Sequence, residues 1–229
     1  MLSVLTRYKS YIICTSPRSG STLLCKLLQA TGKAGVPDSH FHALSVSQWL
    51  GHYGLSNDRF PSKRDALNAV FDAARRKGTG DTDVFGLRLQ RHSFDFLSQQ
   101  LCLLHPKCRT DKERIEAAFG NTLFIHLMRK NKLDQAISYV KATQTGLWHQ
   151  APDGTELERL SEPQEPFYDA PSIAQYHARA IALDEEWDAW FADEKIKPVH
   201  IDYDELSSNP QNMPRLISGH LGQTFEPTP

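Results

Sequence analysis

The chain has 229 residues, with 26 Lys and Arg against 27 Asp and Glu, so its formal charge is −1. This length predicts one domain over residues 1–229, and the charge excludes the strong basic excess of a non-specific nucleic-acid binder. No apolar run reaches the ~18–20 residues that a membrane span needs. The four cysteines show no metal-ligand or CxxC spacing, which indicates reduced thiols in a cytoplasmic protein.

Strands and helices are predicted to alternate along the chain. Residues Tyr11–Thr15 form a short apolar run that is typical of a buried strand, and a helix follows that ends near Gly32. Further strands are predicted over residues 84–90, 122–128 and 198–202. Helical spacing of apolar residues indicates helices over residues 62–77, 94–104, 110–120, 133–146, 172–193 and 212–221. This order predicts an α/β fold, a parallel β-sheet flanked by helices. The long polar segment 146–171 is expected to be a lid or a mobile loop.

The first strand runs into a loop of small residues, Ser16 to Thr22, which ends at a helix N-terminus. Such a loop presents backbone N–H groups and the positive end of the helix dipole, so it suits a phosphate-like anion. In the nucleotide P-loop, G-x-x-x-x-G-K-[ST], a lysine grips the phosphates. Aligning Gly20 with the second glycine places Ser21 at that lysine and Thr22 at the hydroxyl. The lysine is absent, but Arg18 can fold over the anion; the alternative is an ordinary turn with a surface arginine.

A second polar pair follows the strand 122–128. Arg129 leaves this strand and can turn back to a phosphate at the sheet edge. Ser138 lies about two turns into the next helix and follows Ile137, which places it at the edge of the expected apolar stripe. The alternative is a salt-bridged arginine and an exposed serine.

The two motifs together resemble those of a known family. The loop Thr15–Thr22 resembles the 5′-phosphosulfate loop of sulfotransferases that use 3′-phosphoadenosine 5′-phosphosulfate (PAPS), and the stretch Arg129 to Trp148 is similar to a signature of their bacterial trehalose 2-sulfotransferase branch. The resemblance implies a P-loop-like sulfotransferase fold, PAPS as sulfate donor, and a hydroxyl of trehalose, a glycolipid or another carbohydrate-like small molecule as acceptor. It implies that the 3′-phosphate binds to Arg129 and Ser138. It assigns the 5′-phosphosulfate to Pro17, Arg18, Ser19, Gly20, Ser21 and Thr22.

The chain departs from the family pattern where the family carries its catalytic glutamate, in Gly-x-Pro-x-Glu-x-Phe. Ser39 stands at that position, and serine is a poor base. His40 is the preferred replacement because imidazole titrates near neutrality, and Asp38 is the next. Arg88 stands where relatives carry lysine and is expected to neutralise the transferred sulfuryl group. Contacts with the acceptor are expected from Ser39, Phe41 and Trp148.

The family also continues past Pro229 with a segment that closes over the nucleotide, so this segment is expected to be short or missing here. Some members form dimers, and a homodimer is an expectation from the resemblance. No metal is expected, because no triphosphate needs shielding. Two other functions stay open: a P-loop kinase or NTPase that uses ATP and magnesium, and a nucleotide-binding module without catalytic activity.

Overall fold

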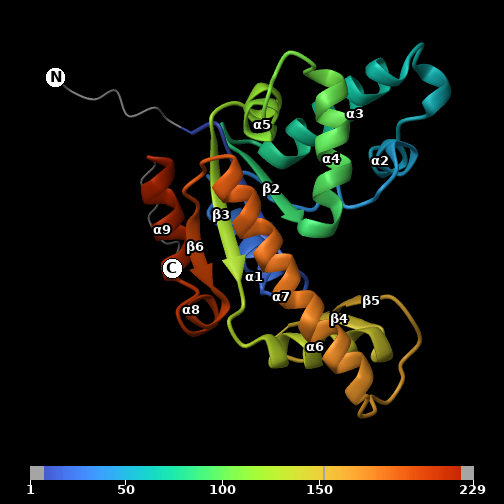
Figure 1. Cartoon of the computed structure of the whole chain (residues 1–229), viewed down its shortest axis with the longest axis vertical. Helices are drawn as coiled ribbons and strands as arrows, with labels where there is room; N and C mark the ends of the chain where they lie inside the picture. Colours follow the sequence, from blue (N-terminus) through green and yellow to red (C-terminus); the bar gives the residue numbers. More distant parts are fainter. Residues whose placement is uncertain (1–7, 152, 223–229) are drawn as a thin grey trace.

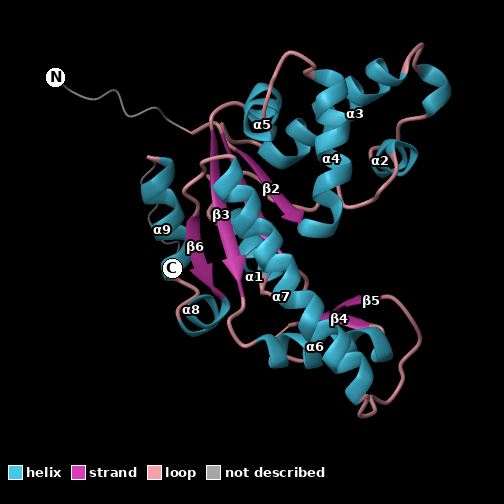
Figure 2. Cartoon of the chain, viewed as in Figure 1, coloured by secondary structure: helices cyan, strands magenta, loops and turns pink. Residues whose placement is uncertain are grey.

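The computed structural model describes residues 8–151 and 153–222, so the segment after Gly222 lies outside the described residues. Its main sheet has four parallel strands in the order β2 (Phe85–Gln90), β1 (Ser10–Thr15), β3 (Thr122–Met128) and β6 (Val199–Asp202). Figures 1 and 2 show this sheet with helices packed around it. The predicted α/β architecture is therefore confirmed.

Helices cover both faces of the sheet, so the side chains of β1 are buried on both sides. Ile12 and Cys14 face one hydrophobic core, and Tyr11 and Ile13 face the other, as the two-residue period of a strand requires. The first core is completed by α2 (Val46–His52), α3 (Lys63–Thr79), α4 (Arg91–Leu104), α5 (Asp111–Phe119) and α7 (Ala170–Asp193). The second core is completed by α1 (Ser21–Ala30), α8 (Tyr203–Ser208) and α9 (Asn212–Leu221).

The parallel strands end at one edge of the sheet. Thr15 pairs with Gln90 on one side and with Leu127 on the other, and Met128 pairs with Asp202. The loops after β1, β3 and β6 therefore leave the sheet close together. Ligands of open α/β sheets bind at this carboxyl edge.

The segment 146–171 contains regular secondary structure that the sequence did not predict. It contains an antiparallel pair, β4 (Leu147–Gln150) and β5 (Glu156–Arg159), and it connects α6 (Lys132–Thr145) to α7. Figure 1 shows this hairpin beside α6, at the end of the molecule away from α3 and α5. Both strands have four residues and lack buried side chains, so no apolar alternation marked them. The short helices α2 and α8 and the 3₁₀ turn Asn57–Arg59 were also not predicted.

Helix α6 presents a different face to the protein than its apolar residues suggest. Ile137 is 43% exposed, whereas Gln135 and Ala136 are fully buried. The reason is that α6 packs along α7, where Ala136 meets Tyr176 and Ala180. The prediction that Ile137 belongs to a buried apolar stripe was therefore wrong, although Ser138 beside it is half-buried.

Two further properties concern the whole described chain. No helix among residues 8–151 and 153–222 is long and apolar enough to cross a bilayer. All four cysteines (Cys14, Cys25, Cys102 and Cys108) lie in this part and are free thiols.

Candidate active site

The loop between β1 and α1 has the backbone of an anion-binding turn. Gly20 (φ 86°) and Arg18 (φ 64°) both take the left-handed conformation, and α1 begins at Ser21. Gly20 precedes the helix and has no side chain that caps its first turn. The first N–H groups of α1 therefore stay available to a bound anion. Behind them, the buried Ser19 hydroxyl donates a hydrogen bond of 2.8 Å to the carbonyl of Ser16.

A network of buried polar groups fixes this loop from behind. The Gln135 amide donates to the Ser16 hydroxyl (3.0 Å) and to the Pro17 carbonyl (2.7 Å). The Ser16 hydroxyl in turn donates to the Asp184 carboxylate, which pairs with Lys132. Gln135 lies within a motif used for the resemblance, but spacing alone did not predict its contact with the loop. The network holds the loop conformation without using its outward N–H groups.

The Arg18 side chain bridges the loop to α6 and β4. Its Nε donates to the Ser138 hydroxyl at 3.0 Å, and its Nη1 donates to the Trp148 carbonyl. Burial and the nearby positive charge of Arg129 lower the pKa of Arg18. The structure therefore brings Ser138 to Arg18, whereas the sequence paired it with Arg129.

Arg129 lies next to this cluster with an unused hydrogen-bond donor. Its guanidinium stands 4.4 Å over the ring of Tyr203, and its Nη2 is 3.6 Å from the exposed Asp134 carboxylate. Its Nε is buried and has no hydrogen-bond partner among the residues that the structure describes. A buried unpaired donor on a cation is costly, and an anionic oxygen would satisfy it. Two neighbouring guanidiniums with a free N–H group fit a phosphate-bearing ligand.

Arg88 organises the opposite side of the loop. Its Nε donates to the Ser39 hydroxyl (2.8 Å), its Nη1 donates to the Thr22 hydroxyl (2.7 Å), and its Nη2 is 3.6 Å from Asp38 Oδ1. The backbone makes this possible because Asp38 bridges Leu87 at the edge of β2. Four predicted site residues from three segments therefore meet at one place.

The chain turns sharply after Asp38, whose carbonyl accepts the N–H of His40 at 2.9 Å, and the His40 and Phe41 side chains point inward. His40 is 2% exposed, its ring stacks on Phe85, and its Nδ1 lies 3.1 Å from the Tyr53 hydroxyl. Burial lowers its pKa to about 4. Phe41 is 1% exposed and packs against aromatic core residues. Both side chains lie in the interior of the protein, so their burial does not favour the roles expected of them, which stay predictions.

The β4–β5 hairpin covers the start of α1. Nε2 of His149 lies 3.0 Å from the Thr22 hydroxyl and 3.2 Å from the Glu158 carboxylate. Burial lowers the pKa of His149, and the Glu158 carboxylate opposes this effect. The sequence did not single out either residue, because the segment lacks the pattern of a strand pair.

The arrangement so far combines an anion-binding helix N-terminus with arginines from three segments. A family model described as Stf0 sulphotransferase matches residues 10–229. The chain belongs to the Stf0 sulphotransferase family. It is a sulfotransferase, as the two motifs indicated.

Named relatives support this assignment over most of the chain. It is 29% identical to the trehalose 2-sulfotransferase of Mycobacterium tuberculosis, with 94% of this chain and 85% of that protein covered. It is 30% identical to the trehalose 2-sulfotransferase of Mycolicibacterium smegmatis, with 93% and 84% covered. The sulfotransferase structure from Alicyclobacillus acidocaldarius matches with a TM-score of 0.50 at 16% identity, covering 98% of this chain and 84% of that one. That likeness supports the fold.

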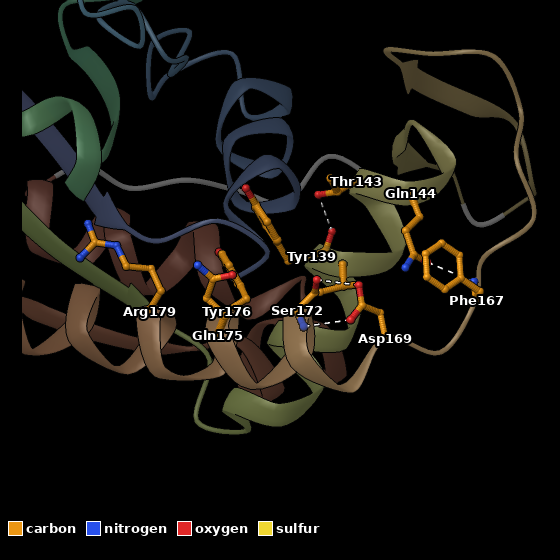
Figure 3. A pocket seen from close by; sticks show the side chains of 10 residues that line it. Tyr139, Thr143, Gln144, Phe167, Asp169, Ser172, Gln175, Tyr176 and Arg179 are labelled. Atoms are coloured by element: carbon orange, nitrogen blue, oxygen red, sulfur yellow. Dashed lines mark hydrogen bonds between the residues drawn. The ribbon is translucent and has the colours of Figure 1, made fainter.

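The sulfotransferase also has a cavity of about 470 Å³ between α6, the segment before α7, and α7 itself. Figure 3 shows its mixed lining of aromatic, amide and charged side chains. One wall is formed by Tyr139 and Tyr176, whose rings stack with centroids 3.7 Å apart. The Tyr176 hydroxyl lies 3.5 Å from the Pro17 carbonyl, so this wall contacts the anion loop. None of the site residues predicted from the sequence lines the cavity.

Proposed function

We propose that this sulfotransferase transfers the sulfuryl group from PAPS to a hydroxyl of a carbohydrate, with trehalose or a trehalose-containing glycolipid as the first acceptors to test. The main support for PAPS as the sulfate donor is the buried Nε of Arg129, which is unpaired among the described residues and lies next to the Arg18–Ser138 bridge. PAPS carries two separate anionic groups, and the site offers an arginine for each. The names of the two mycobacterial relatives support the acceptor.

The donor-binding roles follow from the positions of the cations. The 5′-phosphosulfate binds the loop Pro17–Thr22, whose N–H groups and Arg18 surround the helix N-terminus. The 3′-phosphate binds Arg129 and the Ser138 hydroxyl, which is 3.0 Å from Arg18 Nε in the free protein. Arg88 and the Thr22 hydroxyl contact the sulfuryl group from the other side.

The acceptor enters on the side of the 38–39 turn and of Trp148. Ser39 is held by Arg88, and the half-buried Trp148 packs edge-on against Tyr139. Of the two bases expected from the sequence, Asp38 alone keeps an accessible side chain, 49% exposed. Asp38 therefore remains the base that this loop offers.

The chemistry is an in-line displacement at sulfur, in which alignment and charge stabilisation supply most of the rate. The acceptor oxygen forms a bond to sulfur as the bond between sulfur and the phosphate oxygen breaks. Negative charge grows on that phosphate oxygen, and Arg18 lies at the loop where it is stabilised. A kinase or NTPase is not favoured, because Ser21 replaces the phosphate-gripping lysine.

The proposal is tested by incubating the enzyme with ³⁵S-labelled PAPS and a panel of trehalose, other sugars and glycolipids. We expect sulfate ester formation with at least one carbohydrate, and magnesium-independent binding of adenosine 3′,5′-bisphosphate by calorimetry. Transfer of phosphate from ATP would contradict the proposal. Bisphosphate binding without turnover on any acceptor would instead indicate a nucleotide-binding module.

The Arg129→Gln variant tests the 3′-phosphate site. It removes the charge and the unpaired Nε donor, so the preference for adenosine 3′,5′-bisphosphate over adenosine 5′-phosphate should fall by about 10–100-fold. Calorimetry on both nucleotides measures this preference. Arg215→Gln, an exposed arginine on α9, is the matched control and should leave it unchanged. An unchanged preference in Arg129→Gln would remove Arg129 from the 3′-phosphate site.

The His40→Gln variant tests whether His40 is structural. Because its pKa is lowered to about 4, the folded protein binds the His40 proton more weakly than the unfolded chain does. Stability from neutral His40 is complete above the unfolded value of about 6.5 and is lost as the pH falls toward 4. Between these pH values the free energy of unfolding should fall more in the wild type than in His40→Gln, by on the order of 1–3 kcal/mol. Urea unfolding at each pH measures this difference. Turnover at neutral pH should change less than about three-fold in folded His40→Gln, and a 100-fold loss would restore His40 as the base.

We also propose a cytoplasmic location, which is supported by the four free thiols. The homodimer remains a prediction from the family resemblance.

A further inference from the structure

Gln135 is a fully buried amide that connects α6 to the anion loop. Its Nε2 donates a hydrogen bond of 2.7 Å to the Pro17 carbonyl and one of 3.0 Å to the Ser16 hydroxyl. A backbone carbonyl can only accept, so the contact with Pro17 requires the amide nitrogen of Gln135 to face the loop. The Tyr176 hydroxyl also approaches this carbonyl, at 3.5 Å, so Gln135 makes the shorter of these two contacts.

The amide is part of a closed ring of four polar side chains from three segments. The Ser16 hydroxyl, which accepts from Gln135, donates to Asp184 Oδ1 on α7 at 3.1 Å. Asp184 Oδ2 pairs with Lys132 on α6, and Lys132 Nζ donates back to Gln135 Oε1 at 3.3 Å. Each member of the ring therefore contacts two others, which fixes the Gln135 side chain in one orientation.

The peptide group that Gln135 holds is the one before Arg18. Arg18 has a left-handed backbone (φ 64°), which a residue with a Cβ adopts only where surrounding contacts impose it. By fixing the direction of the Pro17 carbonyl, Gln135 supplies one such contact. One turn further along α6, the Ser138 hydroxyl accepts a hydrogen bond from Nε of Arg18 at 3.0 Å. Helix α6 therefore holds Arg18 both at its backbone and at its guanidinium.

We propose that Gln135 is a positioning residue for sulfuryl transfer, which aligns Arg18 and the anion loop with the bound 5′-phosphosulfate. This inference rests on the proposed function and adds to it a residue that acts through Arg18 rather than on the donor itself. Loss of the Gln135 amide should therefore disturb the loop, while Arg129 and Ser138 keep their side chains for the 3′-phosphate.

The first test compares kcat of Gln135→Met with that of the wild type. Methionine keeps the length of the side chain but removes both hydrogen bonds to the loop. We expect kcat to fall by about 10–100-fold, the effect of a small displacement of a group that aligns the reaction. Gln100→Met is the matched control, because Gln100 is also a buried amide but its Nε2 donates to the Phe96 carbonyl within α4. It should retain full kcat.

Nucleotide binding separates positioning from a general loss of structure. Calorimetry on Gln135→Met should show that adenosine 3′,5′-bisphosphate and adenosine 5′-phosphate both bind more weakly, by the same factor of about ten. The factor is the same because the contacts of the 3′-phosphate are intact. Displacement of the whole of α6 would instead lower the preference for the bisphosphate, as Arg129→Gln is expected to do.

Two further measurements do not depend on the folding of Gln135→Met. Ser16→Ala breaks the ring but keeps the Pro17 contact, so it should lower kcat less than Gln135→Met does. In a crystal structure of the wild type with adenosine 3′,5′-bisphosphate, Nε2 of Gln135 should still donate to the Pro17 carbonyl, and Arg18 should keep its positive φ and contact the 5′-phosphate.

Several results would overturn the role of Gln135 alone. These are retention of at least one third of wild-type kcat by folded Gln135→Met, a reduced preference for the bisphosphate in that variant, a larger loss in Ser16→Ala, or a Pro17 carbonyl turned away from Gln135 in the complex. A wild-type enzyme that neither binds the bisphosphate nor uses PAPS would overturn the proposed function itself.

Discussion

Replacing Arg18 by alanine is expected to lower kcat for sulfuryl transfer by about 10²–10³-fold, the usual effect of removing one charge-stabilising donor from an active site. The reason lies in its position: Arg18 stands in the loop at the start of α1, where we propose that the phosphate oxygen that gains charge is bound. Its contacts with Ser138 and Trp148 also connect the loop to α6 and the hairpin. Steady-state kinetics with saturating PAPS measures the loss.

Two further variants separate charge from geometry. Arg18→Lys keeps the charge but cannot reach Ser138 and Trp148 together, so its kcat should fall between those of the wild type and Arg18→Ala. Arg215→Ala removes an exposed arginine from α9 and controls for net charge. If Arg18→Ala keeps kcat within about three-fold of the wild type, Arg18 does not stabilise the leaving group.

Replacing Gly20 by alanine is expected to abolish measurable donor binding and to destabilise the fold by about 1–3 kcal/mol. A Cβ on Gly20 would stand 2.6 Å from Tyr203 Cδ2, and the backbone there has φ of 86°. Either Tyr203 moves, which withdraws the ring beneath Arg129, or the loop moves and its N–H groups no longer converge. Calorimetry with adenosine 3′,5′-bisphosphate and urea unfolding give the two values.

Gly32→Ala is the matched control for this variant. Gly32 has φ of 62°, also left-handed, but a Cβ there would have no heavy atom of residues 8–151 and 153–222 within 4 Å. The Gly32→Ala variant should therefore lose only about 1 kcal/mol of stability, from backbone strain, and should bind the donor normally. In the double variant Gly20→Ala with Tyr203→Ala the clash is removed, so part of the stability should return. Normal donor binding by Gly20→Ala would show that the loop does not need this close packing.

The sheet and the anion loop were predictable because their signals are local. Strand β1 is an apolar run buried along its whole length, and the loop after it contains small residues around Gly20 at a helix start. The order of strands and helices then requires the loops after β1 and β3 to meet at one sheet edge. Arg18 was predicted from the loop after β1 and Arg129 from its place after β3, whereas the role of Arg88 and the 3′-phosphate role of Arg129 came from the family resemblance.

The parts that the sequence did not predict depend on long-range packing. His40 and Asp38 are two residues apart, yet one turn sends His40 against Phe85 and leaves Asp38 exposed. The position of His149 depends on a hairpin whose strands carry no apolar pattern. The contact of Ser138 with Arg18 depends on how α6 packs along α7. The sequence did not predict this packing, because Ile137 is apolar and indicated a buried position but is exposed.

The most direct measurement is a crystal structure of the enzyme with adenosine 3′,5′-bisphosphate. We expect the 5′-phosphate at the N-terminus of α1, in contact with the backbone N–H groups of residues 19–22 and with Arg18. The 3′-phosphate should accept a hydrogen bond from Nε of Arg129, the buried donor without a partner in the described part of the chain. A nucleotide bound in another place, such as the cavity between α6 and α7, or phosphates with the two ends exchanged, would contradict this account.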